Sequence, residues 1–264
     1  MANSKGNKYP LWTITPDGVV NAIDAMGKAT KMSEPNFATD IGISDDGTVW
    51  ITSTQPDADG GGQKIYYSDG DSNWNEINTA APGGFVIAGA GKDGCVYLTN
   101  QYDLYAIDTK ATSKNDALKL DANVFDINCG GGYFWALKPA KEGEAAVLQF
   151  CKATTPLKWQ VFEGNLMPSS ISVTASGTCF ALLDDLPFEF DLDGKTKKQV
   201  IPGSTQTAIQ ISYKNYSNVI MALEPTIKGN QLMIYTASPT VNPFYNKLDG
   251  LFASGIATTY YVPE

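Results

Sequence analysis

Two tryptophans stand in similar surroundings: Trp74 opens the segment WNEI and Trp159 opens the segment WQVF. Sugar rings present C–H faces that stack on aromatic side chains, while carboxylates, amides and backbone groups bind the hydroxyls. Asp71, three residues before Trp74, can supply such a carboxylate. These residues are therefore candidates for binding a neutral, polar ligand such as a sugar. The alternative is that both tryptophans only pack within the fold, as most large rings do.

Three more residues complete the predicted binding set, because they place an aromatic ring or an amide close to a predicted turn. They are Tyr67, Asn100 and Tyr102. Other aromatic side chains near predicted loops are Tyr66, Tyr133 and Tyr245. For any one of these rings, packing in the core is again the alternative.

The segment 69–73, DGDSN, places oxygen donors at its first, third and fifth residues, Asp69, Asp71 and Asn73, as a calcium loop does. Such a loop needs a glycine at the sixth position and a glutamate at the twelfth, where this chain has Trp74 and Ala80. Calcium requires six or more oxygen ligands. A polar hairpin turn is the leading interpretation, with calcium as the alternative, and the residues suggest no other cofactor.

Composition excludes more chemistry than any motif suggests. The chain of 264 residues has no histidine, and all 19 of its basic residues are lysines. It therefore lacks the imidazole of Ser-His-Asp and Cys-His sites and the bidentate guanidinium that recognises carboxylates and phosphates. A net charge of −9 repels nucleic acids and anionic membranes. The ligands expected are glycans or a cell-surface polysaccharide, with no nucleic acid and no membrane insertion.

The N-terminal sequence MANSKGNKYP contains no apolar run, and no stretch approaches 18 consecutive apolar residues. This pattern predicts neither a secretory signal nor a membrane span, and hence a cytoplasmic protein or one exported by another route. Four cysteines, at positions 95, 129, 151 and 179, fit no zinc spacing and are expected as buried free thiols.

The adjacent acids Asp184 and Asp185 do not predict a glycosidase. Two catalytic carboxylates must face one sugar from about 5–9 Å apart, whereas adjacent residues of a strand point to opposite faces. A solvated turn is the expected structure here. The pair Asp46-Gly47 is expected to form a two-residue type I′ hairpin turn, in which both residues have positive φ.

These candidates must be positioned by a repeated unit of strands. A short apolar strand, a small polar turn and a second strand with a large central residue recur, as in DIGISDDGTVWITS (40–53) and DINCGGGYFWALK (126–138). The central residues are Trp12, Trp50, Tyr97, Trp135, Phe180 and Met221, separated by 38, 47, 38, 45 and 41 residues. This period of about 42 residues is typical of the four-stranded blades of a β-propeller. The pattern predicts an all-β, six-bladed propeller in which residues 1–264 form a single domain.

The two ends of the chain are expected to share one blade. The segment 11–15, around Trp12, reads as a second strand without a first, and the segment 256–262 reads as a first strand without a second. Pairing these two segments would complete the sixth blade and remove an exposed strand edge.

The segments WNEINTAAPGGFVIAGAGKDGCVYLTNQYDLYAID (74–108) and WQVFEGNLMPSSISVTASGTCFALLDDLPFEFD (159–191) resemble the tectonin repeat. That repeat has Trp-x-x-Ile, a turn with glycine, a strand of small residues, Asp-Gly-x-Val-Tyr/Trp and then Ile/Leu-Tyr. The second segment keeps the glycine at Gly177 but lacks the aspartate. The resemblance implies a six-bladed propeller lectin that binds glycans, including those of bacterial or nematode surfaces. Several such lectins have no signal peptide.

The leading hypothesis is therefore a non-enzymatic lectin that binds glycans at several clefts at once, which raises avidity. A protein-interaction scaffold is the first alternative, and it predicts an exposed apolar patch. A propeller enzyme, a lactonase or a lyase, is the second. The central strands contain few acids besides Asp40 and Asp126, which argues against a catalytic metal there.

Overall fold

The computed structural model describes residues 9, 11–24, 27–56, 62–77, 83–91, 93–112, 116–200, 210–212, 219–226, 229–238 and 241–258. Side chains are described for these residues outside 210–229, 233–251 and 258. The regular elements of the described residues are β-strands. They pair into six four-stranded antiparallel sheets, and the sheets are the blades of a β-propeller. The predicted all-β propeller with four-stranded blades is thus confirmed. Among the described residues, no helix is long and apolar enough to cross a bilayer.

Each sheet is named here as a blade, with its strands given from the centre outward. Blade 1 contains β24 (Gly255–Thr258), β1 (Leu11–Ile14), β2 (Val20–Ile23) and β3 (Ala29–Lys31). Blade 2 contains β4 (Ala38–Ile43), β5 (Val49–Pro56), β6 (Gln63–Ser68) and β7 (Asn75–Ile77). Blade 3 contains β8 (Val86–Ala90), β9 (Gly94–Leu98), β10 (Leu104–Asp108) and β11 (Leu118–Asp121).

The second half of the chain repeats this order. Blade 4 contains β12 (Asp126–Gly130), β13 (Tyr133–Pro139), β14 (Ala146–Lys152) and β15 (Gln160–Val161). Blade 5 contains β16 (Ile171–Val173), β17 (Cys179–Leu183), β18 (Leu186–Phe190) and β19 (Lys197–Gln199). Blade 6 contains β20 (Gln210–Ser212), β21 (Val219–Thr226), β22 (Gly229–Ser238) and β23 (Val241–Phe252).

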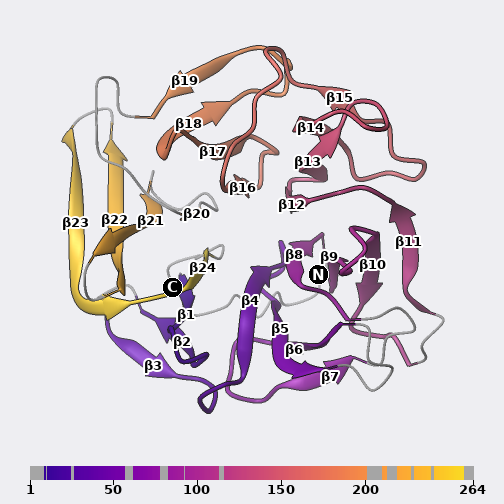
Figure 1. The fold of residues 1–264 in the computed structure, drawn as a ribbon. Coiled ribbons are helices and arrows are strands. Elements are labelled where there is room, and N and C mark those ends of the chain that lie inside the picture. Colours follow the sequence, from indigo (N-terminus) through magenta and orange to yellow (C-terminus); the bar gives the residue numbers. More distant parts are fainter. Residues whose placement is uncertain are drawn as a thin grey trace, which may run out of the picture.

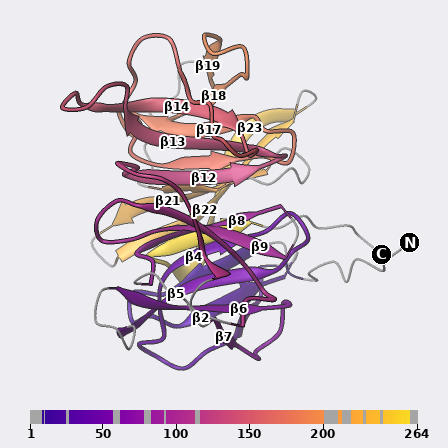
Figure 2. The ribbon, with the colours of Figure 1, turned by 90° about the vertical axis from the view of Figure 1, so that its right-hand side faces the viewer.

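The innermost strands follow one another around a common centre (Figure 1), and contacts link β24, β4, β8, β12, β16 and β20 in that order and β20 back to β24. Seen from the side, the strands run across the thickness of the ring (Figure 2). Blade 1 is built from both ends of the described chain, because β24 pairs antiparallel with β1 in the register Leu11↔Thr258 to Ile14↔Gly255. The predicted pairing partners are therefore present, and residues 259–262 of the predicted strand lie outside the described residues.

The large residues at the centres of the second strands hold the blades together. Trp12, Trp50, Tyr97 and Trp135 are fully buried. The indole of Trp135 donates from Nε1 to the carbonyl of Gly177 in blade 5, 2.8 Å away. The side chain of Met221, the sixth such residue, lies outside the described side chains. The repeat seen in the sequence thus marks the packing between blades.

Small residues on the inner strands let neighbouring blades approach closely. A Cβ added to Gly89 would lie 1.9 Å from the backbone carbon of Ile43, so only glycine fits there. The expected type I′ turn at Asp46-Gly47 is wrong, because only Gly47 has a positive φ, at 92°. Ser44 and Thr48 instead close a three-residue loop, with the Ser44 N–H donating to the Thr48 carbonyl at 2.9 Å.

Candidate functional site

In the described part of the chain, three pockets lie between neighbouring blades, and each takes the name of one lining residue. The Trp74 pocket, of about 470 Å³, lies between blades 1 and 2 and is lined by Lys31, Met32, Ser33, Glu34, Phe37, Tyr66, Ser72 and Trp74. The Cys95 pocket, of about 460 Å³, lies between blades 3 and 4. The Lys158 pocket, of about 430 Å³, lies between blades 4 and 5. Of these, the Trp74 pocket contains a tryptophan from the predicted binding set.

Trp74 stands directly before β7 and reaches across to blade 1. Its Nε1 donates to the carbonyl of Met32 at 2.9 Å. Its ring meets Trp12 edge-on at 6.5 Å and Phe37 at 5.6 Å between centroids. The ring remains half-buried, so one part anchors the blades while another part lines the pocket.

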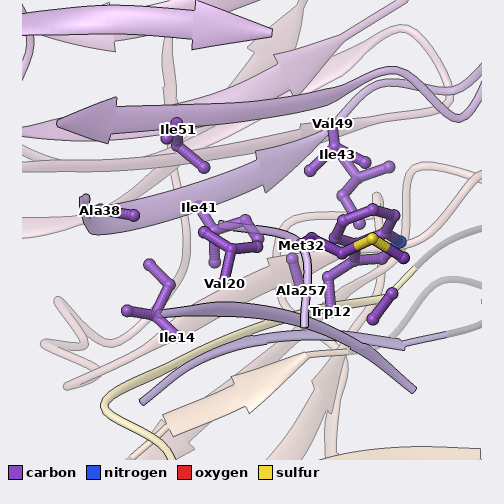
Figure 3. Close-up of a cluster of buried hydrophobic side chains, with 11 residues drawn as sticks. Trp12, Ile14, Val20, Met32, Ala38, Ile41, Ile43, Val49, Ile51 and Ala257 are labelled. Carbon is purple, nitrogen blue, oxygen red and sulfur yellow. The ribbon is translucent and has the colours of Figure 1, made fainter. Parts of the chain in front are cut away.

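The aromatic rings of the pocket pack against an apolar core shared by blades 1 and 2. Figure 3 shows the side chains of this core. Trp12, Ile14 and Val20 of blade 1 meet Ile41 and Ile51 of blade 2 in this cluster. Phe37, Tyr66 and Trp74 pack against it from outside. The rings are therefore supported from below, which gives the pocket a rigid apolar floor.

Tyr66 supplies a second aromatic wall with a fixed hydroxyl. Its OH donates to Oε2 of Glu76 at 3.1 Å, and Lys64 pairs with the same carboxylate at 3.1 Å. Burial, and next the hydrogen bond to Glu76, raise the pKa of Tyr66 to about 12. The phenol therefore keeps its proton at neutral pH.

Polar groups from blade 1 surround the mouth of the pocket. Lys31 and Glu34 form an exposed ion pair of 2.9 Å. Ser33 accepts a hydrogen bond from the Val20 N–H at 2.8 Å, and Ser72 is exposed on the opposite side. An ammonium, a carboxylate and hydroxyls beside aromatic rings are the groups that bind a polar ring with one apolar face.

Trp159 occupies the same repeat position as Trp74 but lies elsewhere. It stands directly before β15, and its Nε1 donates to Oδ2 of Asp121 in blade 3 at 2.5 Å. Asp121 also pairs with Lys138 at 3.3 Å. Packing between blades, the alternative considered for both tryptophans, is thus present in both, and Trp74 additionally lines a pocket.

The structure separates the other predicted residues from Trp74. Tyr67 points to the opposite face of β6 from Tyr66 and packs on Trp50 at 5.4 Å, so it does not line the Trp74 pocket. Asn100 and Tyr102 lie together in the turn between β9 and β10, in blade 3. These three residues therefore lie outside the Trp74 pocket, and their role in ligand binding stays a prediction.

Phe37, Lys31 and Glu34 complete the Trp74 pocket but carry no signal in the sequence. They come from the end of β3 and the segment before β4, where the repeat has no marker residue. Tyr133, another of the candidate rings, lines both the Cys95 pocket and the Lys158 pocket. Tyr245 lies outside the described side chains.

An exposed aromatic patch lies around the turn of blade 3. Tyr102 is 47% exposed and Phe125, before β12, is 41% exposed, and their ring centroids are 4.5 Å apart. An apolar patch of this kind is the feature that a protein-interaction scaffold predicts.

The segment 69–73 forms a polar turn. Oδ1 of Asp71 accepts from the backbone N–H of Asn73 at 2.8 Å, and Oδ2 accepts from its side-chain amide at 3.0 Å. Asp69 is exposed. Within the described residues, no group of three or more acids and cysteines could hold a metal ion. Calcium at Asp69, Asp71 and Asn73 stays a prediction.

Several smaller predictions are confirmed. All four cysteines are buried free thiols. Asp184 and Asp185 form an exposed turn with φ of 49° and 62°.

Two acids occupy equivalent positions on the innermost strands. Asp40 follows a register shift in β4, and its Oδ2 accepts from the Ile87 N–H in blade 3 at 2.9 Å. Burial, with a contribution from the Asp126 carboxylate, raises the pKa of Asp40 to about 7. Burial raises the pKa of Asp126 to about 6.

This arrangement predicts a pH dependence of stability. A carboxyl with a raised pKa binds its proton more tightly in the folded chain than in the unfolded chain, so the free energy of unfolding falls as the pH rises from about 4 to about 7. Asp40→Asn removes the charge and keeps an oxygen acceptor for Ile87. We expect this variant to be more stable than the wild type at pH 8 by roughly 1–3 kcal/mol.

Urea unfolding at pH 5 and pH 8 tests this expectation. The exposed Asp185→Asn variant is the control and should follow the wild type at both values. An equal loss of stability between pH 5 and pH 8 in Asp40→Asn and the wild type would show that Asp40 does not cause the pH dependence.

No protein-family model matches this chain, and no curated protein matches it. Solved structures do resemble it. The chain is similar to one in a crystal structure of a nidogen/laminin complex, with 11% identity, a TM-score of 0.64 and coverage of 94% of this chain and 96% of that chain. It is also similar to TolB from Acinetobacter baumannii, with 8% identity, a TM-score of 0.68 and coverage of 97% and 68%.

A third similar structure is that of XC5397, a gluconolactonase from Xanthomonas campestris. It has 10% identity, a TM-score of 0.55 and coverage of 82% of this chain and 83% of that chain. Sequence identities this low establish a shared fold and no shared function, because one fold hosts many unrelated functions. The chain is therefore a β-propeller, and its function must be argued from its own pockets.

Proposed function

We propose that this protein is a non-enzymatic lectin that binds a neutral glycan in the Trp74 pocket. The observation that carries the proposal is the pocket itself, where Trp74 and Tyr66 form aromatic walls beside the Lys31–Glu34 pair. A sugar ring stacks its C–H face on such walls and directs its hydroxyls to the charged and polar rim. The expected partners are glycans or a cell-surface polysaccharide. The resemblance to the tectonin repeat supports the same function.

The proposal includes a closed, six-bladed ring that behaves as one unit. The contact between β20 and β24 and the pairing of β24 with β1 support this closure. A rigid ring with pockets between several pairs of blades can engage several sugars of one surface, so that weak sites act together. With its net charge of −9, the protein is expected to bind neither nucleic acid nor membranes.

Replacing the tryptophan of the pocket tests the site. We expect Trp74→Ala to weaken binding of a neutral glycan roughly tenfold or more, because it removes the central aromatic contact. Isothermal titration calorimetry measures the affinity. Trp159→Ala is the matched control: it removes a tryptophan from the same repeat position and the same kind of bond between blades. Equal affinities of the two variants would contradict the proposed site.

A protein-interaction scaffold is the second candidate, and the exposed patch of Tyr102 and Phe125 favours it. Both candidates are compatible with one molecule, since the patch and the Trp74 pocket involve different blades. If no glycan binds, the patch becomes the leading candidate for the binding surface.

A further inference from the structure

The Lys158 pocket differs from the Trp74 pocket in its charge. Its lining combines the rings of Tyr133 and Phe150 with polar side chains from the segment that connects β14 to β15. The lining residues are Tyr133, Phe150, Cys151, Lys152, Thr154, Thr155, Pro156, Lys158, Gln160 and Leu192. Among these ten described residues, two are lysines and none is acidic. A cationic pocket is unexpected in a chain with a net charge of −9.

Neither ammonium group is neutralised by the described part of the protein. Other lysines of the described part of the chain are paired with a carboxylate, as Lys138 is with Asp121 at 3.3 Å. Lys152 and Lys158 are exposed and take part in no ion pair among the described residues. Their charges are therefore available to a ligand.

The repeat architecture points Lys158 toward this pocket. Trp159 reaches back to Asp121 in blade 3, and neighbouring residues of an extended segment point to opposite sides. Lys158 and Gln160 consequently face the pocket on the side of blade 5, where Leu192 closes it. The same bond that fixes Trp159 thus also fixes the direction of Lys158.

Two acids, Asp191 and Asp193, flank Leu192 in the sequence, and Asp193 is hydrogen-bonded within its own turn. Asp193, adjacent to Leu192, accepts from the backbone N–H groups of Lys195 and Thr196 at 2.9 and 2.8 Å. Its carboxylate also accepts from the Thr196 hydroxyl at 2.5 Å. These hydrogen bonds lower the pKa of Asp193 to about 2, and the bond from the Thr196 hydroxyl has the largest effect. The Asp193 carboxylate is therefore held by hydrogen bonds within its own turn.

The floor of the pocket is apolar and rigid. The ring of Tyr133 lies against Gly177 in blade 5, where an added Cβ would come within 2.5 Å of it. Phe150 is buried and stacks on Trp135 at 4.8 Å. A ring with one apolar face can rest on this floor while its substituents reach Lys152, Lys158 and the threonine hydroxyls.

We propose that the Lys158 pocket binds an acidic sugar, whose carboxylate or sulfate group pairs with Lys152 and Lys158. This inference rests on the proposed glycan binding and assigns a second, charge-selective site to it. Hydrogen bonds between ammonium and carboxylate or sulfate are stronger than neutral ones, so the acidic group would dominate selectivity. The protein would then bind mixed polysaccharides through a neutral residue in one pocket and an acidic residue in another.

Titration with three probes tests the proposal: trigalacturonate, its uncharged methyl ester and a 6-sulfated chondroitin disaccharide. We expect the wild type to bind at least one acidic probe, and the double variant Lys152→Gln/Lys158→Gln to bind it roughly tenfold more weakly or not at all. The methyl ester should not distinguish the two proteins. Lys141→Gln, in the same blade but outside the pocket lining, is the control and should match the wild type. The two acidic probes distinguish a carboxylate ligand from a sulfate ligand.

The outcomes separate this proposal from that of the Trp74 pocket. Equal binding of the acidic probes by the wild type and the double variant, or no binding at millimolar concentration, overturns the acidic site. If neutral glycans still bind and depend on Trp74, the proposed function survives that result. If binding of the acidic probes depends on the two lysines, the acidic site is supported, even when Trp74→Ala changes the affinity for no glycan.

Discussion

Deleting residues 255–264 is expected to lower the free energy of unfolding by about 4 kcal/mol or more. The deletion removes β24, whose Ile256 and Ala257 are buried and whose backbone pairs with β1. It uncovers the buried Trp12 and leaves β1 as an open edge that can pair with another molecule. Thermal or urea unfolding measures the loss, and size-exclusion chromatography detects the association.

A shorter deletion is the control for this experiment. Removing residues 259–264 leaves β24 complete, and we expect a much smaller loss of stability. If the longer deletion unfolds at the same temperature as the wild type, β24 does not close the ring.

Trp135→Ala is expected to lower the free energy of unfolding by about 3–5 kcal/mol. Trp135 is fully buried, stacks on Phe150 and bonds to Gly177 in blade 5. Its removal leaves a cavity between two blades and an unpaired carbonyl.

Trp135→Phe separates the two contributions, because it keeps most of the apolar contact and removes the indole N–H. This variant should lose less stability than Trp135→Ala. Trp159→Ala, at a half-buried site, should also cost less. Urea unfolding of the three variants gives this order, and a loss below 1 kcal/mol for Trp135→Ala would contradict the role of Trp135 in joining the blades.

The sequence predicts the architecture well because one physical requirement recurs in blades 1 to 5, where the side chains of the second strands are described. A buried large residue must stand at the centre of each second strand, as Trp12, Trp50 and Trp135 do. The spacing of these residues along the chain therefore predicts the arrangement of the blades. The turn at Asp46-Gly47 was harder to predict, because one Asp-Gly pair fits both a two-residue and a three-residue loop.

The binding site is less predictable than the fold because its residues come from two blades. Trp74 is visible from its repeat position, but Phe37 and the Lys31–Glu34 pair join it only through the packing of blade 1 on blade 2. Tyr66 and Tyr67 are adjacent in the sequence and belong to opposite faces of one strand. Only the register of β6 decides which of them meets the pocket.

A glycan array probed with the wild type and with Trp74→Ala tests the central claim most directly, with and without a calcium chelator. The account predicts that the wild type binds a defined class of neutral glycans and that Trp74→Ala binds them far more weakly. Loss of binding with chelator would support calcium at Asp69, Asp71 and Asn73. An array on which neither protein binds at high concentration, or on which both bind equally, would contradict the assignment of a glycan site to the Trp74 pocket.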